Sequence, residues 1–292
     1  MSSTDRKLSS SPWQQLQGYL TLARISNSPT IASNVLTGAA LAGVLVPDRT
    51  TGLVVVAMVL FYTAGMFLND LCDYEIDCQE RPERPLPSGT VSRSAAAVAV
   101  AVLFSLGSLI LWFVGLAAFV SGLALIAVIC AYDVWHKTNP LSPLVMATAR
   151  LLVYVTAFCA FQTQVAGTLL IPASVVLALY LVGLTYIAKT ERLGLTSYWP
   201  AAALFAPSIW FALQGPEATM LPLLALFTGW VVYCITLVYN TRDIGGAIGR
   251  LIAGIALVDG LALAGAGAPS GVLLALVAFG ATLFLQRYIK GT

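Results

Sequence analysis

Charged side chains are scarce in this 292-residue chain and make up 10% of it, whereas soluble globular chains are about a quarter charged. Hydrophobic residues make up 59%, and the mean hydropathy is +0.87. These values exclude a disordered tail, a secreted disulfide scaffold and a nucleic-acid binder. The 15 basic and 13 acidic residues leave a net charge of +2, which argues against any polyanionic partner. The composition therefore predicts a membrane protein surrounded by a lipid bilayer.

Histidine and cysteine are also rare, with one histidine and five cysteines in the chain. His136 lies beside Lys137 at an expected helix end, which favours a surface position over a catalytic one. The cysteines are odd in number and form no CxxC pair, so neither a disulfide framework nor a cysteine metal site is expected. The segment Met1–Trp13 is polar and has no apolar core before a small-residue cleavage site, so no cleaved signal peptide is expected.

Long uncharged runs fill most of the chain. A helix needs about 20 apolar residues to cross a bilayer core. The candidate segments lie near residues 18–46, 52–69, 94–115, 118–135, 142–163, 169–188, 198–214, 220–239, 250–267 and 270–288. The first is too long for one regular helix and contains Pro29 and Gly38, which predicts a kink. Gly115 and a short turn predict a helical hairpin between the third and fourth segments. We therefore expect an all-α polytopic membrane protein with about nine or ten transmembrane helices.

Lysine and arginine residues collect at one set of segment ends. Basic residues are retained on the cytoplasmic side of membrane helices. With ten spans and the N-terminus inside, the outer turns hold only Arg49. The inner segments and helix mouths hold Arg6, Lys7, Arg81, Arg84, Arg93, Lys137, Lys189, Arg192, Arg242, Arg250, Arg287 and Lys290. Both termini are therefore predicted to be cytoplasmic, with a tail at residues 1–17 and a single transmembrane domain at residues 18–290.

Acidic side chains gather directly after the second apolar segment. The polar residues there are Asn69, Asp70, Asp73, Glu75 and Asp77. If the helix continues, steps of about 100° per residue place the asparagine and the three aspartates within roughly 100° of one another. Carboxylates at this spacing repel one another unless a cation lies between them. Oxygen ligands suit Mg²⁺, which keeps several waters and bridges to phosphate oxygens. This face is therefore a candidate Mg²⁺ site.

An arginine pair follows in a proline-rich stretch. Prolines 82, 85 and 87 prevent a regular helix, so Arg81 and Arg84 would project from a loop beside the acidic face. A guanidinium fork can hold phosphate. A single acid at a helix end is usually a solvated loop charge, but the shared face and the bracketed arginine pair together favour a metal and phosphate site. Its position at the mouth of an apolar bundle suits a diphosphate head with an isoprenoid tail among the helices.

These residues resemble the first aspartate motif of the UbiA superfamily of intramembrane prenyltransferases, which reads NDxxDxxxD and precedes an RPLPSG-like stretch. The matching residues here are Asn69, Asp70, Asp73 and Asp77, followed by Arg84-Pro85-Leu86-Pro87-Ser88-Gly89. Further stretches resemble the same family, namely 22–29 with Asn34 and Gly38, 132–137 and 143–150.

The resemblance implies a UbiA-like bundle with its active-site mouth on the cytoplasmic side. In the family, two aspartate motifs hold Mg²⁺ around an allylic diphosphate, ionisation gives a carbocation, and a nucleophilic acceptor captures it. The resemblance implies that the three aspartates bind the metal and that Asn69 orients them. It also implies diphosphate contacts from Arg84 and Lys137. The implied cofactor is Mg²⁺, and the implied partners are an isoprenyl diphosphate and a hydrophobic or aromatic acceptor.

The second aspartate motif of the family is largely missing from this chain. In the matching region, Glu191 is the one acid, between Lys189 and Arg192. Either these two cations replace a metal by fixed positive charge, or Asn240 and Asp243 supply the missing acid from the same expected face. Cations alone do not reproduce the Lewis acidity of a metal. The degenerate motif resembles the EboC-like branch of the superfamily, whose members accompany gene clusters for moving or modifying a small metabolite.

Three charged residues lie within or at the edge of apolar runs, where an unpaired charge is costly. We expect Arg24 and Arg150 to face the cavity rather than to extend to an interface. For Asp259, two alternatives stay open. It pairs with one of these arginines or accepts a proton, or it forms a structural contact between helices.

Three functions compete for this pattern. The first is Mg²⁺-dependent prenyl transfer to an aromatic or lipid acceptor. The second is a non-catalytic or specialised relative that binds or moves a small amphipathic metabolite, which the damaged second motif favours. The third is a secondary transporter, but transporters place their polar site near the bilayer midplane. Because the acids here cluster at one mouth, prenyl transfer is the expected function.

Overall fold

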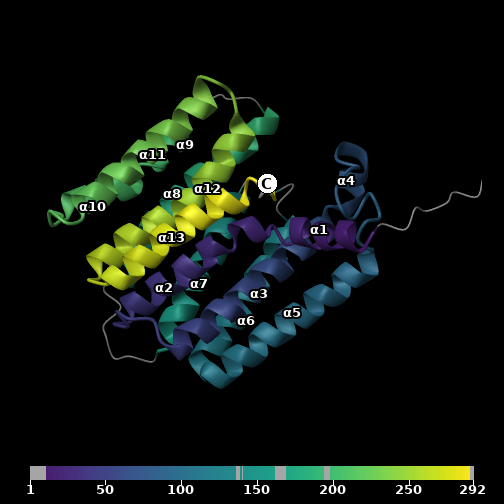
Figure 1. The fold of residues 1–292 in the computed structure, drawn as a ribbon, viewed down its shortest axis with the longest axis horizontal. Coiled ribbons are helices and arrows are strands. Elements are labelled where there is room, and N and C mark those ends of the chain that lie inside the picture. The colour runs from purple at the N-terminus through teal and green to yellow at the C-terminus, as the bar shows by residue number, and fades with distance from the viewer. Residues whose placement is uncertain (1–10, 136–138, 140, 162–168, 194–197, 290–292) are drawn as a thin grey trace, which may run out of the picture.

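The computed structural model of the protein describes residues 11–135, 139, 141–161, 169–193 and 198–289. The regular elements in these ranges are all helices (Figure 1), which confirms the expected all-α class. Seven of them are long and apolar enough to cross a bilayer. These seven are α3 (Arg49–Cys72), α5 (Arg93–Val114), α6 (Leu116–Trp135), α7 (Ser142–Cys159), α8 (Leu170–Leu193), α11 (Leu221–Tyr239) and α12 (Ile244–Gly265). At about 1.5 Å per residue they reach about 27–36 Å, which matches a bilayer core. The chain is a multi-pass membrane protein.

The other apolar segments form shorter helices. These are α1 (Pro12–Leu22), the 3-10 turn η1 (Ile25–Asn27), α2 (Pro29–Leu41), α9 (Trp199–Ala203), α10 (Ala206–Leu213) and α13 (Pro269–Leu285). The expected irregularity of segment 18–46 is confirmed, because η1 separates α1 from α2. Segment 198–214 is divided into α9 and α10. Pro207, near the start of α10, has no N–H with which to continue α9. Whether nine or ten segments cross the membrane stays a prediction.

Local sequence explains where the long helices begin and turn. Asp48 caps α3, since its side chain accepts a hydrogen bond from the Thr51 amide at 2.8 Å. Ser92 caps α5 in the same way. The hairpin between α5 and α6 turns at Gly115, whose φ is 159° and ψ is 153°. A glycine adopts this extended backbone without steric cost.

The short helix α2 lies at the centre of the bundle (Figure 1). It contacts α3 and α7 on one side and α12 and α13 on the other. Gly38 makes the α2–α7 approach possible. A Cβ at this position would lie 2.5 Å from the carbonyl oxygen of Tyr154 and 2.7 Å from the Cβ of Ala157. Small residues at such crossings allow close packing in lipid, where hydrophobic burial gives helices little reason to associate.

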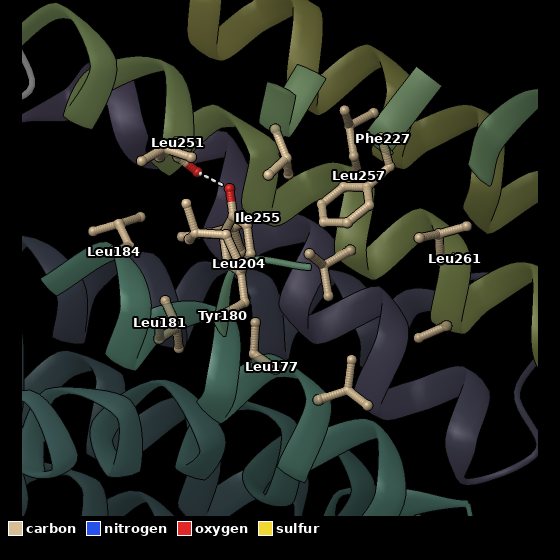
Figure 2. Packing of buried hydrophobic residues seen from close by; sticks show 14 of the residues in the cluster. Leu177, Tyr180, Leu181, Leu184, Leu204, Phe227, Leu251, Ile255, Leu257 and Leu261 are labelled. Carbon is tan, nitrogen blue, oxygen red and sulfur yellow. Dashed lines mark hydrogen bonds between the residues drawn. The ribbon is translucent and has the colours of Figure 1, made fainter. Parts of the chain in front are cut away.

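Helices α8, α11 and α12 pack around a second centre, which Figure 2 shows in detail. Tyr180 of α8 is fully buried, and its hydroxyl donates to the carbonyl oxygen of Leu251 on α12 at 2.7 Å. Phe227 of α11 packs against its ring. A Cβ on Gly254 would lie 2.5 Å from the Tyr180 hydroxyl, so this glycine leaves space for the contact. The tyrosine therefore joins the three helices by both packing and a hydrogen bond.

Helices α1 and α4 (Tyr74–Glu80) lie at the end of the bundle where α3 ends (Figure 1). Leu22 of α1 packs with Phe67 of α3, and with Leu86 and Val91 of the loop that follows α4. This cluster holds the loop and α1 against the end of α3. The acidic residues of the sequence motif lie at this end.

Candidate active site

The acidic motif spans the junction between α3 and α4. The structure ends α3 at Cys72 and begins α4 at Tyr74, with Asp73 between them at φ −88° and ψ −2°. Helical hydrogen bonding continues through the junction, because the Asp73 amide donates to Asn69 and the Asp77 amide donates to Asp73, both at 2.9 Å. The expected continuous face is therefore largely retained despite the break.

Arg84 joins the two buried acids of this face. Its Nη1 lies 2.7 Å from Asp77 Oδ2 and 3.7 Å from Asp70 Oδ1. The loop that carries Arg84 is held by backbone hydrogen bonds from Arg84 to Arg81 and from Ser88 to Arg84, each 3.0 Å long. Arg81 lies half-exposed in the same loop. The proline-bracketed loop thus delivers one guanidinium between two carboxylates.

Arg24 also contacts Asp70, together with Asn69. Its Nη2 lies 3.3 Å from Asp70 Oδ1 and 3.5 Å from Asn69 Oδ1. Its backbone is left-handed, with φ 43° and ψ 45°, at the break between α1 and η1. The Tyr62 hydroxyl of α3 donates to the Arg24 carbonyl at 3.3 Å. The kink in the first apolar segment therefore places Arg24 over the acidic motif.

Asp133 is a member of the site that the sequence analysis missed. It lies near the end of α6 and is 4% exposed, and Asn69 Nδ2 donates to its Oδ1 at 3.0 Å. The signal that could have found it is an isolated acid at the end of the apolar segment 118–135. We call the set Arg24, Asn69, Asp70, Asp77, Arg84 and Asp133 the carboxylate mouth.

The carboxylate mouth balances buried acids with long basic side chains. A buried carboxylate without a partner is costly, and arginine satisfies it by charge and by hydrogen bonds. Within the described part of the chain, no three acidic, histidine or cysteine side chains gather closely enough to enclose a metal ion. Mg²⁺ needs no such cage, because one or two carboxylates suffice when phosphate oxygens and waters supply the rest. The oxygen donors of the mouth fit this mode.

A second polar cluster lies deeper, between α2, α7 and α12. Asp259 of α12 is fully buried and accepts hydrogen bonds from Ser33, Asn34 and Tyr154. Arg150 of α7 donates through Nη2 to the Thr30 hydroxyl at 2.7 Å. Both arginines of the apolar runs therefore turn toward the protein interior, and Asp259 joins three helices.

Two of the residues proposed to replace the second aspartate motif have described partners of their own. Lys189 donates to the Asn139 carbonyl at 3.3 Å. Asp243 caps α12 through the Gly246 amide at 3.0 Å and lies 3.8 Å from Arg250. Asn240 is exposed at the end of α11. Lys137 and the side chains of Glu191 and Arg192 lie outside the described residues.

Residues 31–197, more than half of the chain, match the UbiA prenyltransferase family. The chain belongs to this family. The match contains most of α2, all of α3 to α8 and the whole acidic motif. The resemblance inferred from the aspartate motif is thereby confirmed.

Curated relatives in this family are archaeal proteins named digeranylgeranylglyceryl phosphate synthase. The protein from Pyrococcus furiosus is 34% identical over 133 residues, which cover 45% of this chain and 47% of that one. The protein from Methanothermobacter thermautotrophicus is 44% identical over 75 residues, or 25% of this chain and 27% of that one. The matched segments thus span less than half of each of these relatives.

Solved UbiA structures share the fold over most of the chain. A UbiA homolog from Aeropyrum pernix K1 has a TM-score of 0.67 at 17% identity, covering 85% of this chain and 98% of that one. A UbiA homolog from Archaeoglobus fulgidus bound to GPP and Mg²⁺ has a TM-score of 0.58 at 14% identity, covering 82% and 99%. These similarities confirm the UbiA-like bundle.

Proposed function

We propose that the protein is an intramembrane prenyltransferase that moves an isoprenyl group from an allylic diphosphate to a hydrophobic acceptor, with Mg²⁺. The observation that carries the proposal is the carboxylate mouth, where Arg84 bridges Asp70 and Asp77 at the end of an apolar bundle. The Archaeoglobus fulgidus homolog bound to GPP and Mg²⁺ supports the same substrate class.

Mg²⁺ would be held by Asp70, Asp73 and Asp77, with Asn69 orienting the first of them. When bound, the ion supplies positive charge that stabilises the departing diphosphate. The arginines now paired with Asp70 and Asp77 are suited to the phosphate oxygens, since guanidinium binds carboxylate and phosphate with the same fork. Arg84 and Arg24 would then exchange carboxylate contacts for diphosphate contacts when substrate enters.

The chain's own residues divide the reaction into separate tasks. Arg24 and Arg84 bind and orient the diphosphate, and Arg81, Lys137 and Lys189 are further candidates for this task. The C–O bond of the allylic diphosphate breaks, and the buried apolar walls keep water from the carbocation. The acceptor's nucleophile then forms a new bond to the allylic carbon, and its proton passes to the departed diphosphate.

The basic end of α8 is proposed to replace the family's second aspartate motif. Lys189 lies in the last turns of α8, and Arg192 follows it in the same helix. Fixed positive charge here neutralises part of the diphosphate without a second metal. Asp243 is a poorer candidate, because its carboxylate already caps α12 and faces Arg250.

The acceptor is proposed to be a lipid with a glyceryl head. The curated relatives are named digeranylgeranylglyceryl phosphate synthase, and their matched segments include the Pyrococcus furiosus stretch of 133 residues. An aromatic acceptor remains the alternative within the same reaction class.

We also propose that the mouth and both termini face the cytoplasm, because the basic residues of the chain collect at that end.

The test is release of labelled diphosphate from geranylgeranyl diphosphate by purified protein in nanodiscs containing Mg²⁺, with and without a monoalkylglycerol. We expect Mg²⁺-dependent release and a prenylated product. Asp73→Ala and Asp77→Ala should each abolish both. Asp48→Ala, which removes an exposed acid at the other end of α3, is the matched control and should remain active.

The second candidate function is binding or movement of a small amphipathic metabolite without catalysis. It is favoured by one observation, the single acid Glu191 in place of the family's second aspartate motif. Diphosphate binding without turnover for any acceptor would support this function and would rule out the transferase.

A further inference from the structure

The central helix α2 carries a polar stripe through the middle of an apolar bundle. Its members, together with the turn that leads into α2, are Ser26, Thr30, Ser33, Asn34 and Thr37, and each is fully buried. Polar residues inside a membrane bundle join helices or mark a binding site. The partners of each side chain decide between these roles.

One part of the stripe joins helices. The carboxylate of Asp259 accepts both Asn34 Nδ2 contacts, at 2.9 and 2.8 Å, together with the hydroxyls of Ser33 and Tyr154. These donors satisfy both carboxylate oxygens. Because the amide nitrogen of Asn34 is committed to Asp259, its Oδ1 must point elsewhere.

Another part of the stripe has hydrogen-bonding capacity to spare. Among the described residues, Asn34 Oδ1, Arg150 Nη1 and Ser26 Oγ are buried and have no hydrogen-bond partner. Arg150 is held beside the stripe by its Nη2 bond to Thr30. Thr30 and Asn34 are four residues apart on α2, so they are neighbours on one helix face, with about 5–6 Å between their Cβ atoms. A spare donor and a spare acceptor therefore lie about one turn apart.

Charge decides what kind of group fits there. Arg150 and Asp259 lie close enough to interact electrostatically, and their charges cancel. An anion bound between them would leave a net negative charge in a medium of low dielectric constant, which is costly. A hydroxyl is neutral, accepts a hydrogen bond from Arg150 Nη1 and donates one to Asn34 Oδ1. Its chemistry matches both spare atoms.

The stripe begins next to the carboxylate mouth. Ser26 is two residues after Arg24, whose guanidinium lies 3.3 Å from Asp70. Tyr62 links the same region to α3 through the Arg24 carbonyl at 3.3 Å. A molecule held by the stripe would therefore extend inward from the position proposed for the allylic diphosphate.

We infer that this polar stripe binds uncharged hydroxyl groups of the prenyl acceptor, one at Asn34 and Arg150 and another at Ser26, nearer the carboxylate mouth. Asp259, Tyr154 and Thr30 are positioning residues that fix Asn34 and Arg150. The identity of the ligand as a prenyl acceptor rests on the proposed function. The site itself rests on the buried atoms that have no hydrogen-bond partner.

The test compares the KM for a monoalkylglycerol acceptor with the KM for the allylic diphosphate. Ser26→Ala removes a hydroxyl that has no partner within the protein, so a purely structural stripe predicts no change. We expect the acceptor KM to rise about fivefold relative to the donor KM, the cost of one hydrogen bond. Arg150→Lys keeps the charge opposite Asp259 but loses Nη1, and we expect a rise of about tenfold or more.

Ser121→Ala is the matched control. Its hydroxyl pairs with Thr156 at 2.8 Å between α6 and α7, away from the stripe. We expect this variant to lose some thermal stability while both KM values stay unchanged. Equal KM values in wild type, Ser26→Ala and Arg150→Lys would overturn the inference.

A binding measurement separates this inference from the proposed reaction. Nanodiscs with the protein are dialysed against a labelled monoalkylglycerol and its di-O-methyl ether, with empty nanodiscs as the partition control. Wild type should prefer the free hydroxyls about tenfold, and Arg150→Lys should lose that preference. Such preference without any product would leave the hydroxyl site standing and reject only prenyl transfer. No preference for the hydroxyl form, with or without turnover, would reject the site and indicate that water fills it.

Discussion

The carboxylate mouth and the Asp259 cluster both hold buried acids, but by different kinds of partner. Asp70 lies 3.3 and 3.7 Å from two arginines that reach it from different elements. Asp259 is surrounded by hydroxyl and amide donors of short or rigid side chains within the bundle. Long arginine side chains at the rim can move to another anion, whereas the Asp259 donors cannot leave without repacking three helices. We therefore propose that the arginines at Asp70 can exchange this acid for another anion, whereas the donors at Asp259 hold a fixed geometry.

The largest effect is expected from a change at Asp70, which tests whether the carboxylate mouth binds the metal and the diphosphate. Asp70→Asn keeps the shape of the side chain but removes the charge proposed to bind Mg²⁺. We expect prenyl transfer to fall about 1,000-fold, since interactions with charge developing in a transition state are worth that much. Thermal unfolding in detergent should change little, because both arginines also contact other groups at the mouth. A large drop in unfolding temperature with retained activity would reverse the assignment.

Asp259→Leu tests whether the Asp259 cluster stabilises the packing of α2, α7 and α12. The change leaves Arg150 without its buried counter-charge and removes the partner of Ser33, Asn34 and Tyr154. We expect a loss of about 3–5 kcal/mol in the free energy of unfolding, as when one member of a buried ion pair is removed. Denaturant titration followed by circular dichroism measures it. Unchanged stability would mean that the cluster is not a structural support.

The double change Lys189→Ala and Arg192→Ala tests the proposed substitute for the second aspartate motif. If these cations neutralise diphosphate, its binding should weaken about 10- to 100-fold, the range for hydrogen bonds to charged groups. Asp243→Asn should change it less than about twofold, since its carboxylate caps a helix. Calorimetric titration with a non-hydrolysable prenyl diphosphate analogue gives both values. The opposite ranking would place the missing acid at the turn between α11 and α12.

Tyr180→Phe gives the smallest effect and serves as a reference, because the tyrosine hydroxyl bonds to neither acid. It removes the hydrogen bond to Leu251 shown in Figure 2 but keeps the aromatic packing. We expect a loss of about 1 kcal/mol in unfolding free energy, the usual net value of one hydrogen bond. Prenyl transfer should stay at the wild-type rate. A loss of activity here would show that the α8–α12 contact also affects the site.

Much of the fold could be predicted from the sequence, because long uncharged runs of about 20 residues indicate membrane helices. The hairpin at Gly115 and the broken first segment at Pro29 both followed from single residues with strong backbone preferences. The division of segment 198–214 into α9 and α10 was not predicted, although Pro207 carried the signal.

The site was harder to predict because its members come from separate helices. Asn69, Asp70 and Asp77 could be grouped by helical spacing alone. Asp133 could not, since its contact with Asn69 depends on how α6 packs against α3. The pairing of Arg150 with Thr30, and of Asp259 with Asn34, likewise depends on packing between α2, α7 and α12 that no spacing rule specifies.

Gly38 bears on how acceptor preference could be redesigned. With no room for even one methyl group between α2 and the Tyr154 backbone, the spacing of these two helices is fixed. A library that varies this glycine would lose folded protein before it sampled new specificity. Variation at Ser26, whose hydroxyl has no hydrogen-bond partner within the protein, changes the lining while the spacing of the helices stays constant. The glycine is therefore a position to keep in engineering, and the useful freedom lies at the mouth end of the stripe.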